Sequence, residues 1–185
     1  YLPVREVYEI THEILTDKTA AKSLQYGSTE GFPAFREILT DYVKHVGITT
    51  AQVENTLVIS GGQQGIDLTL KAFINAGDAV LVENPTYLAF LQIAKTYQAK
   101  VYGVKAESYG LNLQDLEDKI KKHKPKVLYC VPTFSNPTGK TYTAENRKAI
   151  ASLTAKYGVI VLEDDPYGKL RFSGEQVPSL KSFDQ

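Results

Sequence analysis

The sequence predicts an α/β fold in which a mainly parallel sheet is flanked by helices. Five short apolar runs alternate with longer amphipathic segments, and four of the runs are nearly continuous in β-branched or aliphatic residues. Such runs are typical of parallel strands covered on both faces, and the segments between them have the length of crossover helices. Two glycines, Gly77 and Gly158, fall just past predicted helices, where a left-handed turn is needed.

The first 47 residues are expected to be helical. Residues 3–16 and 33–46 both place apolar side chains at helical spacing, and Gly47 is a plausible stop for the second helix. The alternating pattern begins after this point. We therefore divide the chain into N-terminal helical segments, residues 1–47, and an alternating β/α core, residues 48–185.

The core contains the predicted strands and crossover helices in turn, without an internal repeat, a low-complexity tract or a linker. The strands are expected at residues 55–60, 78–83, 99–104, 125–131 and 158–164. The helices are expected at residues 63–75, 86–97, 112–122 and 143–156, with Thr143 as the N-cap of the last.

Composition limits the possible classes of function. The 185 residues carry 21 basic and 21 acidic side chains without a long run of either sign, so broad attraction to nucleic acid or anionic lipid is not expected. Cys130 is the single cysteine, and its apolar surroundings favour a buried strand residue. The sequence shows neither a signal peptide nor a run of about 18 apolar residues, which favours a cytoplasmic location and no membrane span.

The two ends of the sequence suggest a piece of a longer protein. Tyr1 opens a pattern that is already helical rather than a leader, no methionine occurs, and the chain stops at "KSFDQ" without closure. We interpret the chain as a fragment.

Ligands of parallel sheets bind at the carboxyl ends of the strands, so the residues after each predicted strand are the candidate site. The first strand runs into "SGGQQG" at 60–65, where free amides and small residues would cradle a phosphate; a plain tight turn explains the glycines equally well. After the second strand, Tyr87 either covers a flat ligand ring or packs at a helix end. After the fourth, a turn stiffened by two prolines presents Asn136, whose amide both donates and accepts hydrogen bonds.

The fifth predicted strand ends in three acids, within "VLEDDPYG". A metal site is not favoured, because no further ligand cluster recurs at suitable spacing and His12, His45 and His123 all lie in helix-like segments. An acid at a buried strand end instead suits a cationic partner such as a protonated ring nitrogen. Asp164 is the candidate for this role, and Tyr167 lies where it could address the same ligand.

Five motifs run through the chain in a recognisable order. They are "YGSTEG" at 26–31, "SGGQQG" at 60–65, "NPTY" at 84–87, "NPTG" at 136–139 and "EDDPY" at 163–167. Together they resemble the class I/II aminotransferases, which are pyridoxal-phosphate enzymes of fold type I. "GGQQG" and "EDDPYGKLRF" are most similar to the branch of 2-aminoadipate, kynurenine and aromatic or branched-chain aminotransferases, and to the related domain of MocR-type regulators. The resemblance implies an incomplete large domain of this fold.

The resemblance also implies how the ring of pyridoxal 5′-phosphate would be held. Asp164 would pair with the pyridine nitrogen and keep it protonated, so that the ring accepts electrons. Asn136 and Tyr167 would hydrogen-bond the phenolic oxygen, while Tyr87 would stack on the ring face. In an alternative register Asp165 would be the ring partner, but only Asp164 has a tyrosine three positions later.

The same resemblance assigns the phosphate group to Gly62 and Gln63 at a helix start. This chain departs from the pattern at Gly62, where the branch often carries serine, so one hydroxyl contact would be missing. In the family, the tyrosine of the first motif reaches the phosphate of the neighbouring subunit. Tyr26 therefore implies a homodimer with shared sites.

The catalytic lysine that the family requires as a Schiff base is not found in the chain. Lys140, Lys169 and Lys181 stand in the wrong context, and each is better interpreted as a solvated surface residue. Arg171 is not expected to grip a substrate carboxylate, because that arginine belongs to the family's C-terminal domain. No catalytic residue is identified, and the fragment alone is expected to be inactive.

The function implied for the intact protein is transfer of an amino group from an amino acid to a 2-oxo acid. Two alternatives stay open. One is a sensor of pyridoxal phosphate within a MocR-type regulator, which alone would bring nucleic acid as a partner through a fused domain. The other is a lyase or decarboxylase on the same scaffold.

Overall fold

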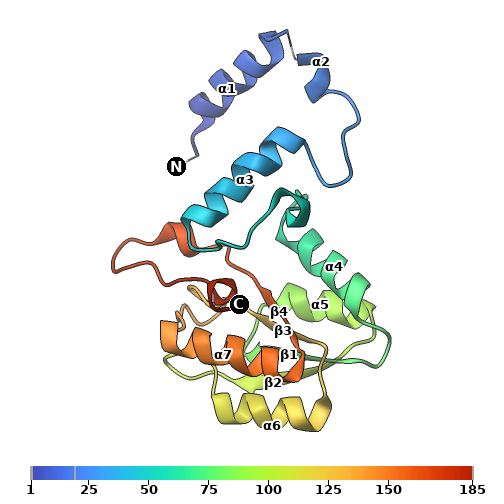
Figure 1. Ribbon diagram of the computed structural model, residues 1–185, viewed down its shortest axis with the longest axis vertical. Helices are drawn as coiled ribbons and strands as arrows, with labels where there is room; N and C mark the ends of the chain where they lie inside the picture. The colour runs from blue at the N-terminus through green and yellow to red at the C-terminus, as the bar shows by residue number, and fades with distance from the viewer. Residues whose placement is uncertain (1, 19, 185) are drawn as a thin grey trace.

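A computed structural model describes residues 2–18 and 20–184 of the chain. At its centre is a parallel sheet with the strand order β2-β1-β3-β4 (Figure 1). The strands are β1 (Ala79–Asn84), β2 (Lys100–Lys105), β3 (Val127–Cys130) and β4 (Ile160–Glu163). One long helix connects each strand to the next, as parallel pairing requires. The predicted α/β class with a parallel sheet is confirmed.

Helices precede the sheet and connect its strands. The α-helices are α1 (Val4–Thr16), α2 (Ala20–Ser23), α3 (Pro33–His45), α4 (Gly62–Phe73), α5 (Leu88–Thr96), α6 (Leu113–His123) and α7 (Ala144–Tyr157). Short 3₁₀ helices are η1 (Val53–Asn55), η2 (Gly168–Leu170) and η3 (Leu180–Phe183).

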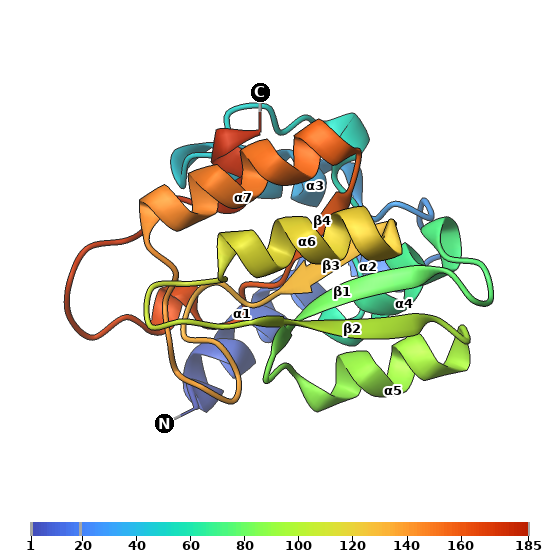
Figure 2. The same cartoon turned by 90° about the horizontal axis from the view of Figure 1, so that it is seen from below.

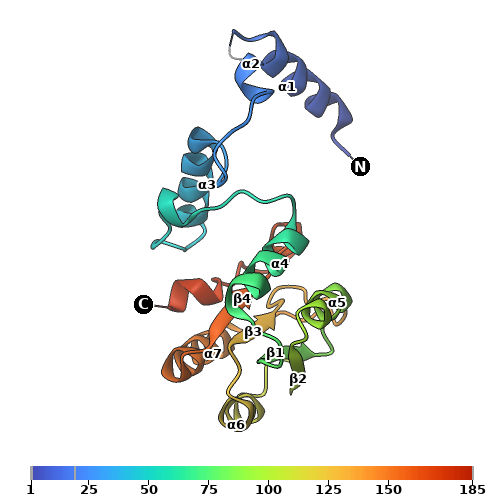
Figure 3. The same cartoon turned by 90° about the vertical axis from the view of Figure 1, so that its right-hand side faces the viewer.

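The sheet separates two apolar layers, because alternate strand residues point to opposite faces. Leu81 and Leu128 pack on the side of α6 and α7, whereas Val80 and Val127 pack on the side of α4 and α5. Figures 2 and 3 show α6 and α7 on one side of the strands and α5 on the other. β1 and β3 are thus covered on both faces, which explains their nearly continuous apolar sequences.

The helix ends follow the expected local chemistry. The Thr143 hydroxyl accepts a hydrogen bond from the Asn146 amide at 3.2 Å, which confirms the predicted N-cap of α7. Gly158 ends the same helix in the left-handed conformation, with φ of 66°. Gly77 has φ of 86° in the turn before β1, and Gly47 has φ of 102° just after α3. Glycine adopts this conformation without the steric penalty of a Cβ atom.

The strand predicted at residues 55–60 is wrong. Residues 56–59 form no regular element, and the Val58 amide donates to the Glu30 carbonyl at 2.9 Å instead of joining the sheet. Leu57 and Ile59 remain 48% and 36% exposed. An apolar run becomes a strand only beside another strand, and β1 to β4 pair only with one another among the described residues.

The N-terminal helices lie away from the sheet. Figures 1 and 3 show α1 and α2 at the far end of the molecule from the strands, with α3 between. No described residue of α1 is buried, although Val4, Val7 and Ile14 are apolar. This apolar helix face is not covered by any other described residue.

Candidate functional site

A cavity of about 220 Å³ opens at the carboxyl ends of β3 and β4, beside the start of α4. Its lining consists of residues from five different segments of the chain. These residues are Gly62, Gln63, Ile66, Tyr87, Tyr129, Val131, Asn136, Asp164, Pro166 and Tyr167. All the residues predicted for the cofactor ring and for its phosphate within one subunit are therefore brought together. This is the position expected for a ligand of a parallel sheet.

The start of α4 supplies free amides to the cavity. Gly61 precedes the helix with φ of 107°, and the first amides that bond back to its carbonyl are those of Gln64 and Gly65. The amides of Gly62 and Gln63 therefore come before the first intrahelical bond. Such amides, together with the helix dipole, favour an anion.

Gly62 also faces the acid of the site. A Cβ atom at Gly62 would lie 4.0 Å from the Asp164 Oδ1 atom, an ordinary contact distance. The start of α4 and the end of β4 thus meet in the lining of one cavity. The backbone at Gly62 does not need glycine for conformational reasons, because its φ lies outside the left-handed region.

Asp164 is held where β4 ends. Its amide donates to the Cys130 carbonyl at 3.0 Å, which continues the pairing of β4 with β3 by one residue. Its carboxylate accepts a hydrogen bond of 2.8 Å from the Tyr129 hydroxyl. Asp165, the alternative ring partner, does not line the cavity; its carboxylate accepts from the Gly168 amide at 2.9 Å. The geometry favours Asp164.

Tyr129 was not predicted as a site residue. It is fully buried and stacks on Phe90, with 4.1 Å between ring centroids. Burial raises the pKa of its hydroxyl, and the neighbouring Asp164 charge raises it further, so the hydroxyl remains a donor. A signal was present in the sequence, since a tyrosine inside an apolar strand covered on both faces needs a partner for its hydroxyl.

Asn136 and Tyr167 point to a common place in the cavity. The Asn136 Nδ2 atom donates to the Tyr167 hydroxyl at 3.5 Å, a long hydrogen bond. On the opposite side, the Gln63 Nε2 atom lies 3.5 Å from the Tyr87 hydroxyl. Two tyrosines thus bring their hydroxyls to the cavity from different turns, each beside a side-chain amide.

The remaining predicted residues lie outside this cavity. Tyr26 is fully exposed in the loop between α2 and α3. Lys169 places its Nζ atom 4.9 Å from the centroid of the Tyr42 ring, and Lys181 pairs with Asp184 at 2.5 Å. Lys140 does not line the cavity either, and no lysine does.

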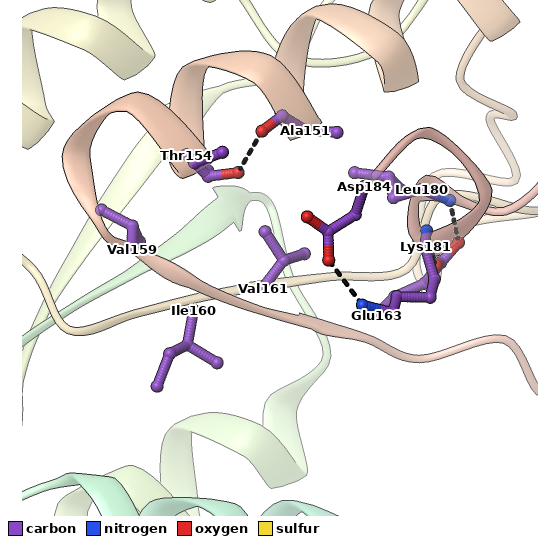
Figure 4. A pocket seen from close by; sticks show the side chains of 10 residues that line it. Ala151, Thr154, Val159, Ile160, Val161, Glu163, Leu180, Lys181 and Asp184 are labelled. Atoms are coloured by element: carbon purple, nitrogen blue, oxygen red, sulfur yellow. Dashed lines mark hydrogen bonds and ion pairs between the residues drawn. The ribbon is translucent and has the colours of Figure 1, made fainter. Parts of the chain in front are cut away.

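A second cavity, of about 330 Å³, lies beside β4 between α7 and η3 (Figure 4). Its lining is mostly apolar, with Glu163, Lys181 and Asp184 at one end. The Glu163 carboxylate accepts from the Leu180 and Lys181 amides, at 3.0 and 3.3 Å. None of the predicted cofactor residues lines this cavity.

The described residues also bear on metal sites and membrane spans. Among residues 2–18 and 20–184, no group of three or more histidine, cysteine, aspartate or glutamate side chains is placed to hold a metal ion. In the same part of the chain, no helix has both the length and the apolar character needed to cross a membrane.

The fold and the cavity together define a class of protein: α/β proteins that take a ligand at the carboxyl ends of parallel strands, next to a glycine-opened helix. The chain belongs to the aminotransferase class I and II family, whose model matches residues 3–183. The predicted family is confirmed.

Individual relatives agree with the family. An aromatic-amino-acid aminotransferase of Thermococcus litoralis is 39% identical over 99% of this chain, which covers 45% of that protein. The crystal structure of a kynurenine aminotransferase from Pyrococcus horikoshii has a TM-score of 0.91 and 40% identity, over 99% of this chain and 46% of that one. This confirms the predicted fold type and branch. An uncharacterised helix-turn-helix-type transcriptional regulator of Bacillus subtilis is 29% identical over 88% of this chain, which covers 33% of it. The chain spans less than half the length of these relatives.

Proposed function

We propose that this chain binds pyridoxal 5′-phosphate in the cavity of about 220 Å³, and that the protein to which it belongs transfers an amino group from an amino acid to a 2-oxo acid. The observation that carries the proposal is the convergence on one cavity of an acid, an asparagine-tyrosine pair, a second tyrosine and a free helix start. The relatives support it, because their names are those of aminotransferases and the kynurenine aminotransferase structure contains the pyridoxamine form of the cofactor.

The chemistry of the donor set fits this cofactor. A phosphate dianion matches the amides of Gly62 and Gln63 at the positive end of the α4 dipole. Asp164 is an acceptor-only carboxylate suited to a protonated ring nitrogen. The pair of Asn136 and Tyr167 offers donors for a phenolic oxygen.

In this proposal, each side chain has one role toward the cofactor. Bound pyridoxal phosphate supplies an electron-accepting ring that stabilises a carbanion at the α-carbon of an amino acid. Asp164 holds a proton at the pyridine nitrogen, and the Tyr129 hydroxyl fixes the orientation of the Asp164 carboxylate. Tyr87 covers one ring face and excludes water from it.

The chain by itself lacks one part of this chemistry. Transamination needs a base that moves a proton to and from the substrate carbon, and no lysine lines the cavity. We expect residues 1–185 to bind the cofactor reversibly and to show no transaminase activity.

The proposed partners follow from the exposed N-terminal region. We propose a homodimer in which the apolar face of α1 is covered and the exposed Tyr26 reaches the phosphate of the neighbouring subunit. We further propose that residues 1–47 serve this contact while residues 48–185 form the cofactor-binding core, and that the protein acts in the cytoplasm.

Adding pyridoxal phosphate to the isolated chain tests the proposal. The expected result is saturable binding by difference absorbance, with chemical-shift changes at the amides of Gly62, Gln63 and Asp164, and an affinity weakened by Asp164→Ala. Borohydride reduction followed by mass spectrometry should leave no stable adduct. Undiminished binding by Asp164→Ala, or a specific adduct at Lys140, Lys169 or Lys181, would overturn the assignment.

A second candidate is favoured by the match to the Bacillus subtilis regulator. In that case the same cavity senses the cofactor and a fused domain binds DNA. The encoded sequence before residue 1 separates the two, because a basic helix-turn-helix segment there would indicate the regulator.

A further inference from the structure

A buried carboxylate lies close to the cavity without touching it. Glu83 is near the end of β1 and is 1% exposed. Both of its oxygens accept hydrogen bonds: Oε1 from the Val131 amide at 3.0 Å and Oε2 from the Tyr142 hydroxyl at 2.7 Å. Burial raises the pKa of Glu83, and these two donors oppose the rise. A buried carboxylate costs free energy that its two hydrogen bonds must offset.

The two donors stand at the two ends of one turn. We call residues 132–142 the Asn136 turn. Its ends are joined by a bond of 2.8 Å from the Tyr142 amide to the Pro132 carbonyl, and its middle by a bond of 2.8 Å from the Ser135 amide to the Lys140 carbonyl. Val131 comes directly before the turn and itself lines the cavity.

A buried positive charge contacts the same turn from α7. The Arg147 guanidinium is 1% exposed and donates to the Pro132 carbonyl at 2.8 Å, to the Thr133 hydroxyl at 3.0 Å and to the Tyr142 carbonyl at 3.2 Å. The ends of the Asn136 turn are therefore held between a carboxylate of the sheet and a guanidinium of a helix. Buried ionic groups bonded in this way fix geometry more than they add stability.

Glu83 connects this turn to a second wall of the cavity. β1 ends at Asn84, and the chain then passes through residues 85–87 to place Tyr87 in the cavity lining. Glu83, four residues before Tyr87 in the chain, is thus bonded at both ends of the turn that presents Asn136. Arg147 has no such connection to the Tyr87 side.

We propose that Glu83 is a positioning residue of the cofactor site, which fixes the Asn136 turn relative to Tyr87. The proposal rests on the proposed function for its meaning, since it concerns the two side chains assigned to the phenolic oxygen and to the ring face. The two hydrogen bonds of Glu83 that hold the turn are present in the chain without ligand.

Hydrogen exchange and ligand binding together test this role. Glu83→Leu has a similar size and removes the acceptors of both the Val131 amide and the Tyr142 hydroxyl. The amides of Ser135 and Tyr142 should then exchange roughly tenfold faster, while amides of the sheet keep their protection. The dissociation constant for pyridoxal phosphate should rise roughly tenfold, with little change for inorganic phosphate, which needs only the start of α4.

Glu117→Leu is the matched control. Glu117 is also a partly buried carboxylate that accepts from a tyrosine hydroxyl, that of Tyr157 at 2.6 Å, but it lies on α6 and does not line this cavity. This variant should leave exchange in the Asn136 turn and the affinity for pyridoxal phosphate unchanged, whatever it does to the urea midpoint. If both variants lower the midpoint and neither speeds exchange at Ser135 selectively, Glu83 is only a structural residue and the proposal is wrong.

Two further results separate the possible failures. Tyr142→Phe removes one of the two hydrogen bonds to Glu83 with little change in shape, so it replaces Glu83→Leu if that variant does not fold, and the same selective acceleration is expected. If the wild-type chain does not bind pyridoxal phosphate, the proposed function fails, whereas the exchange rates still decide whether Glu83 braces the turn.

Discussion

At the scale of single residues, the candidate site depends on side chains that hold other side chains. Asp164 is oriented by a hydroxyl that is itself fixed by an aromatic stack, Tyr129 on Phe90. A carboxylate with one oxygen occupied presents the other in a defined direction. Orientation of this kind lowers the entropic cost of binding a cationic ring.

Tyr129→Phe tests this orientation. The variant keeps the ring stack and removes the donor to Asp164, so the affinity for pyridoxal phosphate should fall about tenfold, as expected for a hydrogen bond to a charged group. Equilibrium titration followed by absorbance measures the change. Tyr97→Phe is the control, because Tyr97 donates to Asp67 at 2.8 Å outside the cavity. Equal effects of the two variants would contradict a specific role for Tyr129.

Gly62→Ser is expected to strengthen phosphate binding. The added Cβ meets Asp164 at an ordinary distance, so this atom fits without displacement. Its hydroxyl adds one donor at the start of α4, worth ~0.5–1.5 kcal/mol, which corresponds to a several-fold lower dissociation constant for inorganic phosphate and for pyridoxal phosphate. Calorimetric titration measures both dissociation constants. Ala76→Ser, in the exposed turn that follows the far end of α4, should change nothing, and weaker binding by Gly62→Ser would place the phosphate elsewhere.

At the scale of elements, the sequence predicted the features that depend on local residues and missed one that depends on strand pairing. The ends of α7 were predictable because Thr143 and Gly158 act on their own helix. The segment 55–60 was misassigned because strand formation depends on a neighbour that no local pattern specifies.

The site residues also fall into two groups, those that local motifs predict and those that depend on contacts distant in the chain. Gly62, Asn136 and Asp164 stand in motifs that follow strands, so the sequence could place them together at one edge of the sheet. The partners of Tyr129 and Glu83 lie 35 and 48 residues away along the chain, and only the register of the sheet brings them into contact.

Contacts between α6 and α7 supply one part of the pH dependence expected of the fold. Glu117 of α6 accepts from the Tyr157 hydroxyl of α7 at 2.6 Å, and Lys121 lies 3.2 Å away. The hydrogen bond from Tyr157, followed by that from Lys121, lowers the pKa of Glu117 from 4.5 to about 2. A lowered folded-state pKa gives stability that is present above pH 4.5 and lost as the pH falls through about 2.

Glu117→Gln should remove this part of the pH dependence. The urea midpoint of the wild type is expected to exceed that of the variant above pH 4.5, with the difference shrinking as the pH falls toward 2. Comparing the two proteins at each pH cancels the contributions of the other carboxyls. Glu175→Gln, in an exposed loop, is the control and should follow the wild type throughout. A constant difference between wild type and Glu117→Gln would refute the assigned pKa.

At the scale of the whole molecule, the apolar face of α1 has no cover within the described chain. Val7 and Ile14 are one heptad apart and are 58% and 49% exposed. Surfaces of this kind are typical of contacts between subunits. The proposed homodimer covers this face and brings Tyr26 toward a neighbouring site.

Val7→Glu combined with Ile14→Glu should convert a dimer to a monomer, because two charges would be buried unpaired in the contact. Sedimentation velocity measures the mass, and circular dichroism checks that the helices are retained. Glu9→Gln changes a charged residue of the same helix and should leave the mass unchanged. A wild-type chain that sediments as a monomer at every concentration would contradict the assignment of α1 to the dimer contact.

The strand order β2-β1-β3-β4 has a consequence for the isolated chain. β4 pairs with β3 on one side only, and Ile160 on it is 37% exposed. An edge strand with unpaired backbone groups is a template for another strand, so edge-to-edge aggregation of the chain is expected to begin at β4. The ion pair of Lys181 and Asp184 lies beside this edge and opposes such growth. Solubility of the chain should therefore depend on these two charges more than on its net charge, which is zero.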